Sequence, residues 1–260
     1  MVRAITTIVC SFLLLLSFSC SREDTGPQET IPGSGIVTFT AMTGQGETRS
    51  SQEGSFETGD AIGVFAIEPK TGVYWAVNNK YTYDGQKFKP EAEADNIIVT
   101  VGTDFDFYVY YPFKTGQTDI TGISHTAGNQ NEKAGWISAD FMTATYTDPI
   151  RDYTVPLNFK HRMSTVEVRI ERNDGVREAT MENVKRTSRF NLLTGGISTD
   201  ESKGNCTMYK YSEAGGTTVF RVTIPGTKAY DLLQLCVPYG NHRHQAPRNL
   251  RHGHRRGKTT

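Results

Sequence analysis

The sequence is poor in cysteine and has no apolar run long enough for a membrane-spanning helix. Only 4 of its 260 residues are cysteine. Cys10 and Cys20 lie near the start, which leaves Cys206 and Cys236 as the pair that a disulfide can join. The most apolar stretch, Ile5 to Phe18, is shorter than the roughly 20 residues that a helix needs to cross a bilayer. The sequence therefore indicates neither a disulfide-stapled scaffold nor a stable helical span.

Common enzyme signatures are also missing. The sequence has no Walker loop, no dinucleotide-binding glycine fingerprint, no Gly-x-Ser-x-Gly elbow and no Cys-x-x-Cys pair. His161 lies between Lys160 and Arg162, which oppose its protonation, so we expect a structural role. A hydrolase would need a polar cleft around His161 or His125 with a carboxylate partner. We expect no enzymatic activity, cofactor or metal.

The residues that are abundant favour strands and turns. Glycine (25), phenylalanine (13) and tyrosine (12) are plentiful, a bias typical of all-β proteins. Val166, Val168 and Ile170 alternate with Glu167 and Arg169, which is the period of a half-buried strand. A chain of this length has room for one large or two modest domains. We therefore expect an all-β fold.

Residues 56–66 are the clearest single element. Gly59 and Asp60 supply turn chemistry, and the apolar residues after them include Gly63, which disfavours a helix. This stretch predicts a buried strand. Further strands are expected at 36–41, 73–77, 81–83, 97–101, 105–113, 155–170, 192–193, 206–209, 218–224 and 232–237, and a long surface loop at 114–135.

The first residues look like an export signal. A short basic start precedes the apolar run, and small residues precede Cys20, so we expect residues 1–19 to be a lipoprotein signal peptide and Cys20 to carry the lipid. The alternative is an ordinary signal with an incidental cysteine. Residues 20–35, with Pro, Gly and Ser, suit a flexible tether. Glu23 and Asp24 resemble a signal for display on the outer face of the outer membrane.

Several segments resemble the fimbrillin family, the pilins and pilus-associated surface lipoproteins of type V pili in Gram-negative anaerobes. The resemblance covers roughly residues 36–240 and rests on Phe56–Ala66, Tyr81–Gly85 with Phe88–Pro90, Tyr110–Phe113, and Leu157-x-Phe159-x-His161. It implies two tandem transthyretin-like β-sandwich domains, 36–160 and 161–240. With about four strands against about seven in a full sandwich, the second domain looks incomplete.

The resemblance also implies a function, as a structural or adhesive pilus component that assembles by strand exchange with other pilus subunits. In pilin members an arginine-specific protease cuts a loop like that of Arg49 and frees the first strand, although an ordinary solvated arginine is the alternative. The first strand here comprises Ile36, Val37, Thr38, Phe39, Thr40 and Ala41. The lipid on Cys20 would hold the protein at the outer membrane, on the cell surface.

The last segment, 241–260, is a basic tail. It holds six arginine and lysine residues, four histidines and no acid, and we expect it to be disordered. It is an out-of-frame or truncated end, a solvated tail or, least favoured, an anion-binding patch. Pro247 and Gly253 make it a poor version of the C-terminal strand that usually serves as donor in the family. We expect no nucleic-acid partner.

A second hypothesis is a glycan-binding surface lipoprotein of an outer-membrane polysaccharide-uptake system, or an adhesin with a host or glycan ligand. Trp75, Trp136 and Tyr74 could stack on sugar rings. Their exposure discriminates between the two hypotheses, since coplanar exposed rings favour sugar binding and buried rings favour the pilin.

Overall fold

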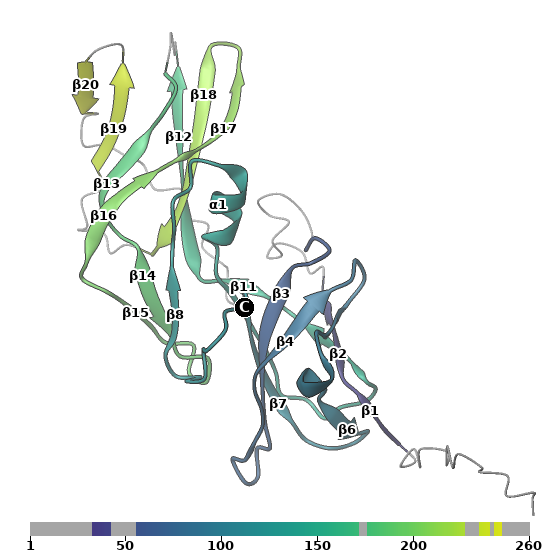
Figure 1. Ribbon diagram of the computed structural model, residues 1–260. Coiled ribbons are helices and arrows are strands. Elements are labelled where there is room, and N and C mark those ends of the chain that lie inside the picture. Colours follow the sequence, from purple (N-terminus) through teal and green to yellow (C-terminus); the bar gives the residue numbers. More distant parts are fainter. Residues whose placement is uncertain (1–32, 43–55, 172–175, 227–233, 240–241, 246–260) are drawn as a thin grey trace, which may run out of the picture. The chain divides into compact units, whose positions relative to one another are not determined.

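The computed structural model describes residues 33–42, 56–171, 176–226, 234–239 and 242–245, and within them β-strands predominate (Figure 1). The predicted all-β sandwich fold is confirmed. Residues from Gly35 onward form one compact unit, and the account below concerns that unit. None of the helices in the described ranges is long and apolar enough to cross a membrane.

The described elements, in chain order, are β1 (Ser34–Ile36), β2 (Thr38–Ala41), β3 (Ala61–Ile67), β4 (Tyr74–Tyr83), β5 (Phe88–Pro90), the 3-10 helix η2 (Glu93–Asp95), β6 (Ile98–Thr100), β7 (Asp106–Tyr111), β8 (Ile123–Thr126), α1 (Lys133–Ser138), β9 (Met142–Tyr146), β10 (Thr154–Leu157), β11 (Lys160–His161), β12 (Met163–Glu171), β13 (Thr180–Lys185), β14 (Thr187–Phe190), β15 (Ile197–Thr199), β16 (Lys203–Thr207), β17 (Tyr209–Ala214), β18 (Thr217–Pro225), β19 (Gln234–Tyr239) and β20 (His242–Gln245).

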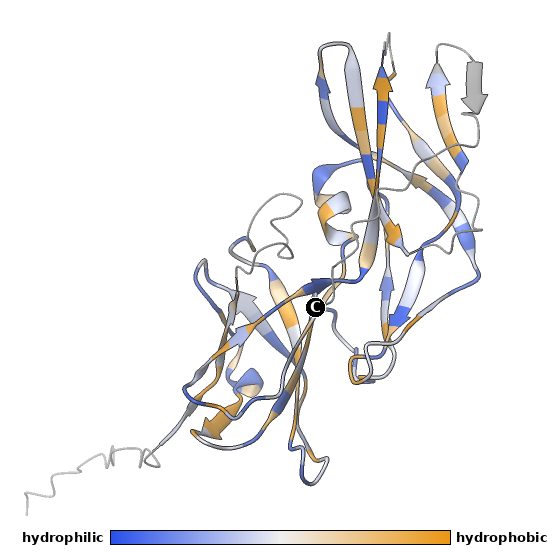
Figure 2. Ribbon diagram, turned by 180° about the vertical axis from the view of Figure 1, so that it is seen from behind, coloured by the Kyte–Doolittle hydropathy of each residue, from blue (hydrophilic) through white to orange (hydrophobic). Residues whose placement is uncertain are grey.

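The strands of the described residues form five sheets. The largest has the order β10-β2-β5-β4-β3-β7-β9-β11, and its described pairs are antiparallel except for β10 with β2. The others are β1-β6, β12-β18-β17, β16-β13-β19-β20 and β15-β14-β8. Apolar residues recur between polar ones along many of the strands (Figure 2), as expected when one face of a sheet is buried.

Strand β3 is buried on both faces, as its apolar sequence predicts. Ile62 and Val64 belong to the core on one face of the largest sheet. Phe65, on the opposite face, belongs to another core. An apolar residue at nearly every position is what a strand covered on both sides requires.

Gly63 in this strand is required by a close approach. A Cβ atom at this position would collide with the ring of Tyr110 and lie 2.6 Å from Oδ1 of Asn78. The Tyr110 hydroxyl donates a hydrogen bond to this same Oδ1 (2.7 Å), and the Asn78 amide donates to the carbonyl of Lys114 (2.9 Å). Glycine thus leaves space for a buried tyrosine whose hydroxyl is satisfied.

An aromatic stack joins the largest sheet to the sheet that contains β8 and β14. Phe141 stacks on Tyr110 (centroids 5.8 Å apart) and on Phe190 of β14 (4.1 Å, planes 17° apart). Each such pair adds about 0.5–1.5 kcal/mol beyond its area burial. The parts predicted as two domains therefore share a core, and the boundary at 160/161 stays a prediction.

The expected surface loop at 114–135 is wrong. It contains β8, which pairs with β14 (Ile123↔Phe190 to Thr126↔Thr187), and the start of α1. Figure 1 shows β8 beside β14. The short strand was hidden because only Ile123 is apolar in it, while its other buried side chain is His125.

Gln130, in the same segment, closes part of a sheet edge with its side chain. It is fully buried, its amide N–H donates to the carbonyl of Thr223 in β18 (2.7 Å), and its amide oxygen accepts from the Thr223 N–H (2.7 Å). Strand β17 pairs with β18 only from Ala214↔Thr217 to Tyr209↔Arg221. The Gln130 amide thus takes the place of a strand at Thr223, since it presents the same donor and acceptor.

The later part of the chain follows the alternation read from the sequence. Val168 is buried, with Val166 and Ile170 packed against the same core, while Glu167 accepts hydrogen bonds from Arg169 and Arg221 on the other face. The described residues beyond 161 hold β12 to β20, more strands than the four expected. The tail was expected to be disordered, which is wrong for β20, because its backbone pairs with β19.

Candidate assembly site around the leading strand

The predicted first strand, 36–41, is two strands in the structure. The chain changes sheets at Val37, whose N–H donates to the carbonyl of Ile97 (2.9 Å). Strand β1, before it, pairs with β6, and β2, after it, lies in the large sheet between β10 and β5. The single strand expected there is wrong in this detail, and both halves belong to sheets.

Strand β2 is paired mainly on one side. It runs parallel to β10 over four residue pairs, from Thr154↔Thr38 to Leu157↔Ala41, and meets β5 at one pair, Phe39↔Phe88. Around these, the N–H of Thr38 donates to the Tyr153 carbonyl (2.7 Å). The attachment of β2 to the fold therefore depends chiefly on β10.

The segment that runs from β1 through β2, residues 34–41, is called the leading segment below. Two of its side chains fill the core of the largest sheet. Val37 and Phe39 are fully buried. The Phe39 ring makes edge contacts with Tyr81 (5.0 Å between centroids) and Phe107 (5.3 Å). Burial of an apolar side chain of this size is worth ~1.5–3 kcal/mol, so a replacement for this segment needs apolar residues at the same two positions.

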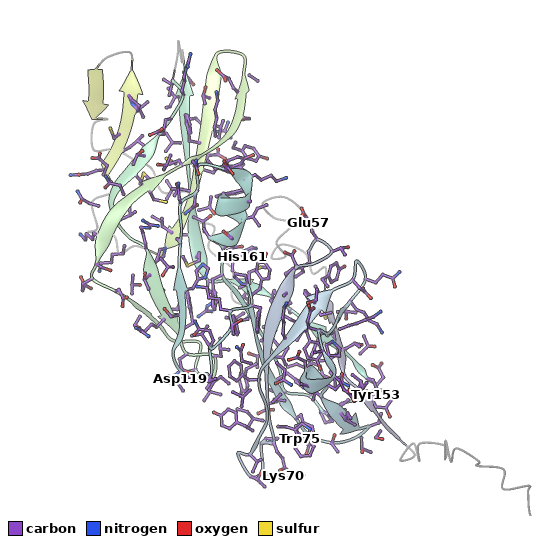
Figure 3. All side chains as sticks on the ribbon, viewed as in Figure 1. Glu57, Lys70, Trp75, Asp119, Tyr153 and His161 are labelled. Atoms are coloured by element: carbon purple, nitrogen blue, oxygen red, sulfur yellow. The ribbon has the colours of Figure 1, made fainter. Side chains whose placement is uncertain are left out.

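Tyr153 covers the start of the segment. A Cβ atom at Gly35 would lie 2.8 Å from the Tyr153 ring, so a side chain there would displace the ring. Tyr153 directly precedes β10 and is labelled in Figure 3. The same chain stretch, 153–157, thus both covers and pairs with the leading segment.

Strand β10 lies at the end of its sheet, and β2 is its neighbour there. The place of β2 is therefore bordered by two strands, β10 and β5, whose backbone groups face it. A vacant place of this kind can take another extended segment, because main-chain hydrogen bonds supply affinity and pockets for alternate side chains supply specificity. Cys20 and Arg49, the predicted lipid and cleavage sites, lie outside the described residues.

The two histidines of the hydrolase hypothesis have different surroundings. Nδ1 of His161 lies 2.6 Å from Oδ2 of Asp140, a carboxylate partner that its sequence neighbours did not reveal. His125 is 1% exposed, and burial lowers its pKa to about 4. Its Nε2 lies 3.0 Å from the carbonyl of Ala139. Because the side chain is buried, a substrate cannot reach it. Within the described ranges, no His, Cys, Asp and Glu side chains group into a metal site.

The aromatic residues of the glycan hypothesis do not form one platform. Trp136 of α1 is 2% exposed and stacks on Tyr209 (5.5 Å, planes 19° apart), as core packing predicts. Trp75 and Tyr74 of β4 are 57% and 46% exposed. Trp75 and Tyr74 thus have the exposure that the glycan hypothesis requires, whereas Trp136 does not.

Cys206 and Cys236 are free and buried. Cys206 lies opposite Met181, and Cys236 opposite Thr180, on the two sides of β13. With a strand between them they do not pair. Burial raises the pKa of the Cys206 thiol, which lowers its reactivity.

Comparisons with known proteins agree with this architecture. A family model described as fimbrillin-like matches residues 48–251, which extends past residue 240, where the sequence resemblance was expected to stop. A candidate cell adhesion protein of Bacteroides ovatus is similar in structure, with a TM-score of 0.61 and 16% identity over 81% of this chain and 84% of that one. One of Bacteroides uniformis has a TM-score of 0.56 and 19% identity over 79% and 80%. At such identities the likeness shows the fold alone. No curated protein sequence matches significantly.

Proposed function

Because this chain belongs to the fimbrillin-like family, we propose that it is a pilus or adhesin component that joins its neighbours by exchanging its leading strand. The observation that carries the proposal is the position of β2 in its sheet: it lies between β10 and β5, and its Phe39 side chain is buried. Family membership supports a cell-surface or fimbrial location and a structural rather than enzymatic role.

The energetics of the exchange follow from the contacts that β2 makes at this position. Loss of the leading segment exposes the backbone of β10 and β5 and opens space in the core where Val37 and Phe39 lay. A strand from another subunit with apolar residues two positions apart restores both. Because the outgoing and incoming strands make the same kinds of contact, the net free-energy change of the exchange is small once the leading segment is detached.

Detachment and anchoring complete the proposal. Cleavage after Arg49 would separate β1 and β2 from the rest of the chain, since both precede it in the sequence. Lipid on Cys20 would hold the uncut protein at the outer membrane, and partners are other pilus subunits. Cleavage would therefore convert an anchored form into one with an open strand position.

The test uses an arginine-specific protease on the mature chain, with an Arg49→Ala variant as the uncut control. After cleavage, a fluorescent peptide of residues 33–42 should replace the original segment, measured by anisotropy, whereas a peptide carrying Phe39→Asp should not. The Arg49→Ala protein should bind neither peptide. Equal binding of both peptides to the cut protein, or of neither, contradicts strand exchange at this position.

A further inference from the structure

An open groove of about 440 Å³ lies beside the turn that joins β3 to β4. Its lining includes Trp75 of β4, Glu68 and Lys70 of the turn, and Thr103, Asp104 and Phe105, which precede β7. Trp75 and Lys70 lie at the same end of this hairpin (Figure 3). The volume is within the range of small-molecule sites, about 300–1,000 Å³. None of these residues belongs to the leading strand.

Trp75 is held in place yet open to solvent. The centroid of its ring lies 5.5 Å from that of Phe105, with 57° between the two ring planes. Phe105 is 8% exposed and belongs to the core of the largest sheet. The contact supports the indole from one side, while 57% of the residue stays exposed. A supported, exposed indole is a flat apolar surface with little conformational freedom left to lose on binding.

The rim of the groove is polar and carries both signs of charge. The Lys70 ammonium is 3.2 Å from Oδ2 of Asp104, and Oε2 of Glu68 accepts a hydrogen bond from the Thr71 hydroxyl (2.6 Å). Carboxylates accept from neighbouring hydroxyls, and an ammonium donates to them. With two carboxylates and one ammonium, the rim has a net charge that disfavours anions.

We propose that this groove binds a neutral saccharide. The apolar face of one hexose ring stacks on the Trp75 indole, and its hydroxyl groups donate to Asp104 and Glu68 and accept from Lys70. A flat apolar face surrounded by hydroxyls is the chemistry that this indole and its polar rim complement. The carboxylates disfavour acidic sugars such as uronates. The groove is also lined by Ile98, Val99 and Thr100 of β6, the partner of β1, so sugar binding is tested on the uncut protein, where it can fail or succeed whether or not the leading strand exchanges.

The test titrates the whole protein with maltotriose, cellotriose and mannotriose, and with trigalacturonate as the acidic counterpart, using tryptophan fluorescence and saturation-transfer NMR. At least one neutral trisaccharide should bind saturably, and trigalacturonate more weakly. Trp75→Ala should weaken binding at least about tenfold, a loss of about 1.4 kcal/mol. Tyr74→Ala is the matched control, since Tyr74 is an exposed aromatic neighbour on β4 that does not line the groove.

Asp104→Asn gives a second, structurally mild variant that should reduce affinity several-fold with the melting temperature little changed. The absence of binding for all three neutral sugars overturns the proposal. So does binding that survives both Trp75→Ala and Asp104→Asn. Self-association that is lost in Trp75→Ala, without sugar binding, would assign the groove to a protein contact instead and would equally overturn it.

Discussion

Replacing Phe39 by alanine removes the ring at the centre of the leading strand. The side chain is fully buried, and it contacts Tyr81 and Phe107 edge-on at 5.0 and 5.3 Å. Large-to-small changes of this kind cost about 3–5 kcal/mol, because transfer energy and packing are lost together. Since whole domains are stable by only about 5–15 kcal/mol, the loss should be a large fraction of the total.

The measurement is urea unfolding followed by circular dichroism, with Thr40→Ala as control because Thr40 is only partly buried on the same strand. Phe39→Ala should lower the urea midpoint by about 1 M or more with the slope unchanged, and Thr40→Ala should hardly move it. After cleavage at Arg49, the wild-type 33–42 peptide at about 100 times its Kd should restore about 2.7 kcal/mol. A Phe39→Ala protein as stable as wild type refutes the idea that the leading strand completes the core.

Three further changes test other parts of the fold. Tyr110→Phe should cost about 1–2 kcal/mol in the free energy of unfolding, measured with urea, since it leaves the partly buried Asn78 oxygen without its 2.7 Å donor. Gln130→Ala should cost about 2–3 kcal/mol, because both Thr223 backbone groups lose a buried partner. Stability should fall by up to about 3 kcal/mol as the pH falls from about 6.5 to about 4. Burial lowers the pKa of His125 to about 4, so in that window the unfolded chain binds a proton that the folded chain does not.

Controls for the second and third of these follow from the same contacts. Gln130→Glu, which keeps the shape but loses the donor when ionised, should also destabilise. A Gln130→Ala protein with wild-type stability would mean that water replaces the amide at the sheet edge. His125→Asn should flatten the pH dependence between about 4 and 6.5, and an unchanged profile would assign it to other groups.

Regular alternation and turn chemistry were enough to predict much of the fold. Strands β3 and β12 were predictable because nearly every apolar residue along them packs in one of the cores. Short elements were not, because a strand such as β8 holds too few residues to show a period, and it is fixed by its partner β14, about 60 residues later in the chain. Long-range pairing outweighs local propensity in such segments.

For the candidate site, the sequence predicted the leading segment but not its neighbours. Parallel pairing with β10 leaves no local signature, since the two strands are distant in the chain. The exposure of Trp75 was likewise hidden, because an aromatic residue on a strand reads the same whether its side is covered or not. The Asp140 partner of His161 lies 21 residues away and became evident only in three dimensions.

The parallel pair of β2 and β10 also sets an order of events. Thr38 and Thr154, whose hydroxyls lie 3.3 Å apart, are separated by 116 residues, so the earlier strand has to wait until most of the chain is present. Non-local closures of this kind are slow. During folding, the place of β2 beside β10 therefore stays open until late, and in the proposed strand exchange a strand of another molecule enters most easily in that interval.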